Sequence, residues 1–285
     1  MNIPPGKVPR MNRDSIAVVI PALNESLRIR EVVQGALAEC RNVIVVDDGS
    51  DDDTAGQVRD LPITLLRHEE RLGKGASLRD GFAEALRQGF AGVLTMDGDG
   101  QHSAADIPRM LDAARRYPRH IVIGARLRKR SQQPRYRRLA NAFGDWGIAW
   151  GTGYQIADTQ SGQRLYPAEV AALGDVPGED FVFEAQILIS AARELGTRCV
   201  SIPIESRYAC VHASEEAAGQ PSEFRASHFR PLRDFSRITS HVIGCVLRRG
   251  GIPAVWRSIR SNPPLIDDPT GEFAPMASRE PVGTR

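Results

Sequence analysis

The chain has 285 residues, which is enough for one large α/β domain or two small ones. Its hydrophobic content of 41% and charged content of 25% exclude a largely disordered chain, while a formal net charge of +2 says little about partners. No run approaches the ~18 consecutive apolar residues of a membrane-spanning helix, and the N-terminus shows no apolar signal segment.

The first half of the chain alternates between two kinds of pattern. Residues 1–14 carry three prolines without periodicity, which predicts a loose tail. Continuous apolar runs predict buried strands at 16–20, 43–46, 63–66, 92–96 and 121–123. Helical spacing predicts helices at 26–40, 74–88 and 104–117. Strands that alternate with helices and are almost wholly apolar predict a mostly parallel sheet with helices on both faces.

The second half is less regular. It predicts helices at 137–152 and 180–195 and a strand at 198–203, followed by a polar, mobile loop over 208–229. We expect one α/β domain over 15–229, a C-terminal amphipathic helical segment over 230–260 and a disordered tail over 261–285.

Three polar segments follow predicted strands directly, at 21–25, 47–50 and 97–101. In a parallel sheet the carboxyl ends of neighbouring strands lie at one edge, and ligands bind beyond that edge. The shared placement predicts a single site built from all three segments.

Asp97 and Asp99 stand one residue apart at the end of a predicted strand, so their side chains share one side. Two adjacent carboxylates repel unless a cation lies between them, and a hard divalent metal that also binds phosphates suits this arrangement. Gln101 is a further candidate contact, and His102 could be a ligand or a solvated histidine at a helix start. The alternative is that both aspartates are solvated residues before a helix cap.

Four motifs occur in the order and spacing of family-two glycosyltransferases. They are Val18–Glu25 (VVIPALNE), Val45–Ser50 (VVDDGS), Gly73–Gly75 (GKG) and Asp97–Gln101 (DGDGQ). The chain is similar to this family over residues 15–250, and within it to the dolichyl-phosphate or polyprenyl-phosphate sugar transferases. The resemblance implies a GT-A fold, a nucleotide-sugar donor and a Mg²⁺ or Mn²⁺ ion.

The resemblance also implies roles for individual residues. Asp99 is implied as the main metal ligand and hence as catalytic, with Asp97 and Gln101 as further metal contacts. The implied donor-binding residues are Pro21, Ala22, Asn24, Glu25, Asp47, Asp48, Lys74 and Asp97. From the residues alone, Asp47–Asp53 could equally be a solvated acidic loop, and Lys74 a solvated lysine at a helix start.

The acceptor side rests on two further segments. Asp158–Tyr166 resembles the acceptor segment of the polyprenyl-phosphate subgroup, which implies that Ser161 and Arg164 bind the acceptor phosphate. Ser227–Arg230 resembles a segment that closes over the donor diphosphate, which makes His228 and Arg230 donor-binding candidates. The basic run 126–138 could bind a phosphorylated acceptor or acidic lipid, or be a solvated loop; its single aromatic residue argues against nucleic acid.

The expected reaction is metal-dependent, inverting transfer of a sugar to a polyprenyl-phosphate or other lipid-linked acceptor. A hydroxyl acceptor would need a general base, for which Glu184 or Asp180 is the candidate, although Glu184 could be an ordinary helix carboxylate. A non-catalytic nucleotide-binding relative is the remaining alternative.

Two observations bear on location. The four cysteines are scattered, which argues against a zinc site or disulfide framework and for reduced thiols in the cytoplasm. Residues 231–249 carry an apolar stripe at helical spacing together with arginines, which could bind anionic lipid as a peripheral contact or pack as a core helix.

Overall fold

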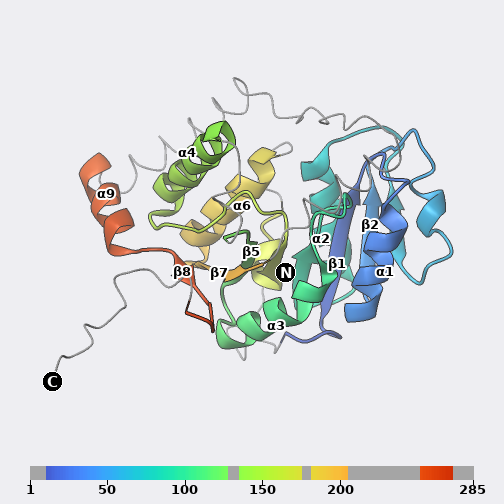
Figure 1. The fold of residues 1–285 in the computed structure, drawn as a ribbon, viewed down its shortest axis with the longest axis horizontal. Helices are drawn as coiled ribbons and strands as arrows, with labels where there is room; N and C mark the ends of the chain where they lie inside the picture. The colour runs from blue at the N-terminus through green and yellow to red at the C-terminus, as the bar shows by residue number, and fades with distance from the viewer. Residues whose placement is uncertain (1–10, 128–134, 175–180, 205–250, 272–285) are drawn as a thin grey trace.

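The computed structural model describes residues 11–127, 135–174, 181–204 and 251–271. Their centre is an eight-stranded sheet in the order β3-β2-β1-β4-β6-β5-β7-β8, flanked by helices (Figure 1). The strands are β1 (Ile16–Ala22), β2 (Val43–Asp47), β3 (Thr64–Arg67), β4 (Gly92–Thr95), β5 (Ile121–Ala125), β6 (Arg164–Pro167), β7 (Cys199–Pro203) and β8 (Leu265–Ile266).

The helices are α1 (Ile29–Glu39), α2 (Lys74–Arg87), α3 (Ile107–Arg116), α4 (Arg135–Thr152), α5 (Ala168–Ala171), α6 (Phe181–Glu194) and α9 (Ile252–Ser261), with short 3₁₀ turns η1 (Gly56–Val58) and η2 (Ala104–Asp106). α1, α2, α3, α4 and α6 lie where the apolar spacing predicts them, with boundaries shifted by a few residues, whereas α5 was not predicted and α9 lies at the end of the expected 230–260 helical segment.

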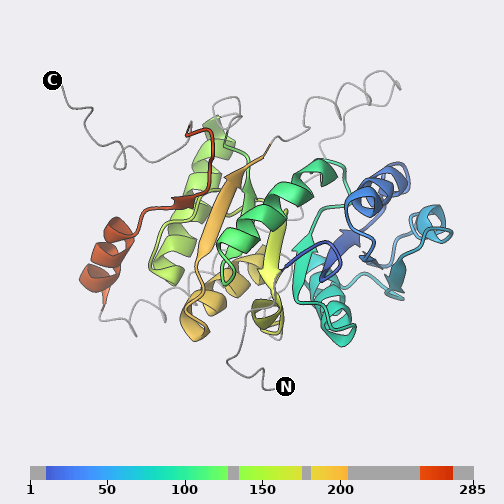
Figure 2. The same cartoon turned by 90° about the horizontal axis from the view of Figure 1, so that it is seen from below.

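Two hydrophobic cores lie on opposite faces of the sheet, which confirms the predicted layered architecture. Along β1, Ile16, Val18 and Ile20 point into the core formed with α1 and α3. The alternate residues Ala17 and Val19 point into the core formed with α2 and α6. The two helix layers are separated by the sheet in Figure 2. Burial on both faces explains why these strands are apolar without alternation.

The sheet is parallel except at β6. This strand lies antiparallel between β4 and β5, with Arg164 opposite Thr95 and Ile123. The sequence analysis did not predict a strand here, because the four residues include an arginine and a proline. Their charge and shape are accommodated only by the tertiary surroundings described below.

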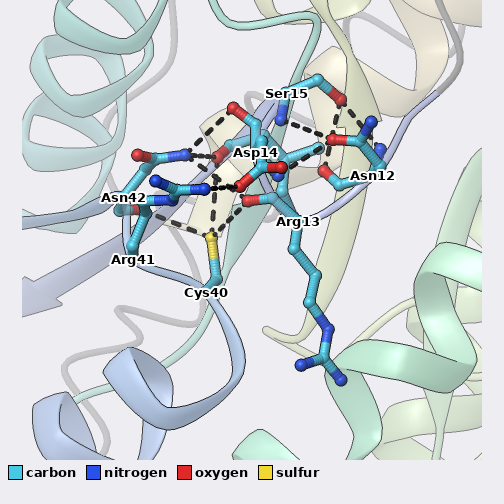
Figure 3. Close-up of polar contacts among 8 residues, drawn as sticks. Asn12, Arg13, Asp14, Ser15, Cys40, Arg41 and Asn42 are labelled. Atoms are coloured by element: carbon cyan, nitrogen blue, oxygen red, sulfur yellow. Dashed lines mark hydrogen bonds and ion pairs between the residues drawn. The ribbon is translucent and has the colours of Figure 1, made fainter.

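The predicted loose tail is wrong for its last four residues. Met11 is buried, and the Asn12 side chain accepts hydrogen bonds from the backbone of Asp14 and Ser15, at 2.9 Å each (Figure 3). Asn42 Nδ2 donates to the Ile16 carbonyl at 3.0 Å, and Arg41 pairs with Asp14. These contacts form a polar turn that fixes the start of β1.

The predicted disordered tail is wrong for residues 261–271. β8 pairs in parallel with β7, with Leu265 opposite Val200, and the amide of Asp267 donates to the Ser201 carbonyl at 2.9 Å. Arg116 of α3 forms an ion pair with Asp267. Two apolar residues are too short a run to indicate a strand, so only the neighbouring β7 makes this one evident.

No helix in these described ranges is both long enough and apolar enough to cross a membrane. Cys40 and Cys199 are buried free thiols.

Candidate active site

The three polar segments that follow β1, β2 and β4 meet at one edge of the sheet. Ala22 lies opposite Asp47, and the Asp48 amide donates to the Ala22 carbonyl at 2.9 Å. A Cβ on Gly98 would lie 3.3 Å from the Pro21 carbonyl oxygen, so the chain after β4 passes close to the end of β1. The predicted common placement of these segments is therefore confirmed.

The 21–25 turn is held by the loop after β2. Asn24 has a φ of 54°, in the left-handed region that asparagine tolerates better than most residues. Its amide donates to Ser50 Oγ at 3.0 Å, and its side-chain oxygen accepts from the Asp51 amide at 2.9 Å. The Glu25 amide donates to Thr54 Oγ1 at 2.8 Å. The two loops consequently form one wall of the site.

The two carboxylates at the end of β2 are buried, so they are not part of a solvated acidic loop. Asp47 Oδ1 accepts from the Ser50 amide at 3.1 Å, and its Oδ2 lies 3.2 Å from Arg67 Nε without hydrogen-bond geometry. Asp48 accepts from the Leu72 and Gly73 amides, at 2.9 Å each. Asp48 thus fixes the turn that begins α2.

Gly73, the residue before α2, has a φ of 96°, which favours glycine. His68 braces the same turn, because Nδ1 lies 2.8 Å from Asp48 Oδ1 and Nε2 lies 2.9 Å from Asp80 Oδ2. Burial lowers the pKa of His68, but the hydrogen bonds and charges of these two carboxylates outweigh it and raise the pKa above its ordinary value. The sequence analysis did not find His68, because its two partners lie on other elements.

Lys74 joins three elements at the centre of the site. Its Nζ lies 2.7 Å from Asp97 Oδ1 and 3.4 Å from Glu184 Oε2, so α2, the segment after β4 and α6 converge there. Burial opposes ionisation of Asp97, but the positive charge of Lys74 outweighs it and holds the pKa of that carboxyl below its usual range. Lys74 is therefore not merely a solvated lysine.

Asp99 and His102 belong to the acidic segment, which comprises residues 97–102 after β4. Burial and the negative charge of Asp97 raise the pKa of Asp99, whose Oδ1 accepts from the Gln101 amide at 2.9 Å. His102 is only 7% exposed, so the solvated histidine considered above is wrong. Its Nδ1 lies 3.6 Å from Asp97 Oδ2 and has no hydrogen-bond partner among the described residues. Burial lowers the pKa of His102.

The residues at this edge fit a divalent metal that is completed by substrate. Within the described ranges, no cluster of three or more His, Cys, Asp or Glu side chains is arranged to hold an ion by itself. Burial and the repulsion from Asp97 together raise the pKa of Asp99, and a cation between the two carboxylates would relieve that repulsion. Mg²⁺ is commonly held by one or two carboxylates together with substrate phosphates, and this donor set matches that pattern.

The segment from Asp158 to Arg164 lies against the end of β4 and the acidic segment that follows it. Asp158 has a φ of 55° and accepts from Arg126 Nε and Nη2, at 2.8 Å each. Thr95 Oγ1 donates to the Gly162 carbonyl at 2.7 Å. A Cβ on Gly162 would lie 2.4 Å from Asp97 Oδ2, so the absence of a side chain lets this carboxylate take its position.

The placement of Ser161 and Arg164 argues against the predicted contact with an acceptor phosphate. Ser161 is fully buried, and Arg164 is 2% exposed. The guanidinium donates to the carbonyl oxygens of Ser161 at 2.8 Å, Glu184 at 3.0 Å and Thr159 at 2.7 Å. Arg164 therefore binds β6, the preceding loop and α6 together inside the protein, where its charge is satisfied by carbonyl dipoles.

Several candidates lie outside the described residues. They are Asp180, His228, Arg230, the stripe over 231–249 and most of the basic run over 126–138.

Residues 17–171 match the sequence model described as Glycosyl transferase family 2, which covers just over half of the chain. The chain belongs to this family. As a family-two glycosyltransferase it is an enzyme of the class predicted above, and its strand-end motifs lie within the matched residues.

Two curated relatives are similar over most of their length. An uncharacterized protein of Methanocaldococcus jannaschii is 29% identical over 209 residues, which make up 71% of this chain and 85% of the relative. An undecaprenyl-phosphate mannosyltransferase of Micrococcus luteus is 28% identical over 207 residues, which make up 66% of this chain and 82% of that protein.

Solved structures confirm the GT-A fold. Glucosyl-3-phosphoglycerate synthase of Mycobacterium tuberculosis in complex with UDP superposes with a TM-score of 0.55 and 22% identity, covering 84% of this chain and 81% of that one. The same enzyme with Mn²⁺ and UDP-glucose gives a TM-score of 0.52 at 20% identity, covering 84% and 80%.

Proposed function

We propose that this family-two glycosyltransferase transfers a sugar from a nucleotide-diphosphate donor to a polyprenyl-phosphate acceptor, with a divalent metal ion and inversion at the anomeric carbon. The convergence of Lys74, Asp97 and Asp99 at the carboxyl edge of the sheet carries the proposal. Relatives named for transfer to undecaprenyl and dolichyl phosphate support the acceptor class. Structural neighbours bound to UDP and Mn²⁺ support the donor and the metal.

The nucleotide binds across the ends of β1 and β2. The wall made by the 21–25 turn and the 47–54 loop offers the residues assigned to it, namely Pro21, Ala22, Asn24, Glu25, Asp47 and Asp48. Because Asp48 already accepts from the Leu72 and Gly73 amides, its main contribution is to hold the turn before Lys74. This turn presents the Lys74 ammonium group to the donor diphosphate.

The leaving group carries negative charge when the bond from sugar to diphosphate breaks. Asp97 and Asp99, with Gln101 beside them in the sequence, would hold a divalent ion, which would supply positive charge to stabilise the departing diphosphate. Lys74 adds a positive charge from α2, with its Nζ 2.7 Å from Asp97 Oδ1. The acceptor attacks from the opposite face of the sugar, which inverts the anomeric carbon.

A polyprenyl phosphate is already an anion at neutral pH and needs no general base. The reaction then requires only that the acceptor phosphate be placed opposite the diphosphate. We place this step at the surface of a membrane, because the nucleotide sugar is water-soluble and the acceptor is a lipid.

A hydroxyl acceptor is the second candidate, and one observation favours it. The Glu184 carboxylate lies in the same cluster, 3.4 Å from Lys74 Nζ, and its side chain is only 9% exposed. A carboxylate so placed is able to take a proton from a hydroxyl nucleophile. In that case Glu184→Gln should abolish transfer to the hydroxyl acceptor, whereas transfer to a phosphate should survive.

The function is tested first by thermal shift with UDP, GDP and their sugar conjugates, with and without Mn²⁺. A ligand that binds the folded state raises the melting temperature. The same measurement therefore identifies the nucleobase of the donor and shows whether binding depends on Mn²⁺. The selected donor is then incubated with a short-chain polyprenyl phosphate in detergent, and the glycolipid is detected by mass spectrometry.

Asp99→Asn is the matched inactive variant, with Asp112→Asn as its control. Asp112 lies on α3 and is 55% exposed in an ion pair with Arg115, so the same chemical change there should leave transfer intact. If neither UDP nor GDP shifts the melting temperature with or without Mn²⁺, the proposed donor site is wrong. Donor binding without any glycolipid product would instead overturn the acceptor class alone.

A further inference from the structure

α9 is attached to the domain through one buried side chain and a small set of hydrogen bonds to residues 153–155. Val255 is its single buried side chain, and a cavity of about 360 Å³ lies between the helix and the ends of α4 and α6. Ser258 Oγ donates to the Gly153 carbonyl at 2.8 Å, which ties α9 to the end of α4. A helix held in this way adds little to the hydrophobic core, so packing alone does not explain its composition.

The outer face of α9 is apolar and aromatic. Ile252 is 66% exposed and Trp256 is 49% exposed, and the two lie one turn apart on the same face. Pro253 is exposed between them. The neighbouring α4 carries the other two tryptophans of the chain, with Trp146 57% exposed and its ring centroid 5.7 Å from that of Trp150. α9 and α4 lie at the same end of the molecule (Figure 1).

The charge of α9 is wholly positive. Arg257 and Arg260 are exposed, and the helix contains no acidic residue. Neither arginine has a carboxylate partner within the described ranges, and the Arg260 guanidinium lies 4.6 Å from the centroid of the Trp256 ring. Tryptophan and arginine at the edge of an apolar face are the residues that bind the headgroup region of a membrane.

We infer that the outer face of α9, formed by Ile252, Trp256, Arg257 and Arg260, binds the surface of an anionic lipid bilayer. The inference extends the proposed function, since a polyprenyl-phosphate acceptor resides in a membrane. It places the contact on α9, after the 231–249 stripe for which the sequence analysis left a lipid contact and a core helix open. The apolar side chains enter the headgroup region, and the two arginines attract anionic headgroups.

Flotation with vesicles tests the inference on the full chain. The protein should float with phosphatidylcholine vesicles that contain phosphatidylglycerol at low salt, and should be released at high salt. The double variant I252S/W256S should partition at least about tenfold more weakly. Leu27→Ser is its matched control, because Leu27 is 83% exposed just before α1, at the other end of the molecule. R257Q/R260Q should lose the preference for phosphatidylglycerol while retaining weak binding.

Intrinsic fluorescence provides a second measurement. All three tryptophans lie on α4 and α9, so brominated lipids should quench the emission of the wild-type chain, and Trp256→Phe should remove part of that quenching. Equal flotation of I252S/W256S and wild type overturns the inference. The inference is also overturned if the wild type does not float but forms a dimer, seen by light scattering, that I252S/W256S dissociates. The face would then bind a second copy of the chain.

Transfer to the short-chain acceptor in detergent keeps the two proposals separate. I252S/W256S should retain that activity, since α9 lies outside the donor site. Lost flotation with retained transfer supports the α9 surface. Absent transfer in the wild type counts against the proposed function and leaves the lipid measurement unaffected.

Discussion

The Lys74 ammonium group lies 2.7 Å from Asp97 Oδ1, so a lysine at the start of α2 holds the acidic segment that follows β4. Both side chains are 27% exposed. Partial burial of the pair strengthens the attraction between the two charges, and the exposed remainder leaves both groups accessible to a ligand. Lys74 thus neutralises Asp97 in the free protein and is in position to contact the donor diphosphate when it binds.

Replacing Lys74 by methionine should lower the free energy of unfolding by about 2 kcal/mol, because it leaves the Asp97 carboxylate partly buried without its nearest cation. The affinity for the nucleoside diphosphate should fall as well. Urea denaturation and calorimetry measure the two effects, and Lys74→Arg is the control that keeps the charge. A methionine variant that matches wild type in both measurements would remove Lys74 from the site.

Asp99→Asn should reduce transfer by about a hundredfold or more, because the metal loses a charged ligand. Its melting temperature should stay the same or rise, because the variant removes a negative charge that Asp97 repels. A loss of activity together with a rise in stability distinguishes a functional carboxylate from one that supports the fold. Turnover near the wild-type level at limiting Mn²⁺ would contradict the metal assignment.

Gly162→Ala should displace Asp97 and reduce donor binding, since the new Cβ would lie 2.4 Å from Asp97 Oδ2. Gly147→Ala is the matched control. A Cβ there meets nothing within 4 Å, and alanine in place of a glycine within α4 should stabilise the protein by about 0.5–1 kcal/mol. Calorimetry with the nucleoside diphosphate compares the two variants. Equal affinity in both would show that Asp97 tolerates the shift.

Arg164→Lys should destabilise the protein by about 3 kcal/mol or more, because an ammonium group cannot reach the three carbonyl oxygens that the buried guanidinium contacts. Thermal and urea unfolding measure the loss. A role in binding the acceptor phosphate predicts a different result, in which stability is kept and only the KM for the acceptor rises. The two results distinguish a structural role of the buried Arg164 from the acceptor-binding role that the sequence resemblance implied.

The sequence predicts the strands that are long and uniformly apolar, and with them the edge at which the site forms. It does not predict β6, because a buried arginine is acceptable only where carbonyl groups from α6 and the 159–161 loop surround it. β8 is missed because two residues carry no periodicity. The residues of the acidic segment are evident from their motif. The contact of Lys74 with Glu184 depends on how α2 and α6 pack, and the burial of His102 depends on its tertiary surroundings; no local pattern contains that information.

Stability should depend on pH through His68, which lies between Asp48 and Asp80. These two carboxylates raise the pKa of His68 in the folded protein above its ordinary value near 6.5, despite the opposing effect of burial. A raised folded pKa means that the protonated histidine stabilises the fold. This contribution is fully present below about pH 6.5 and is lost as the pH rises through the folded pKa.

The measurement is the free energy of unfolding in urea across this range for wild type and His68→Gln. The wild type should lose stability relative to the variant as the pH rises from 6 to 8, and the difference between them should be largest at the acidic end. Because His68 also braces the turn that presents Lys74, the variant should bind the nucleoside diphosphate more weakly at pH 6. A difference in stability that stays constant across the range would mean that His68 is neutral in the folded protein and acts through its hydrogen bonds alone.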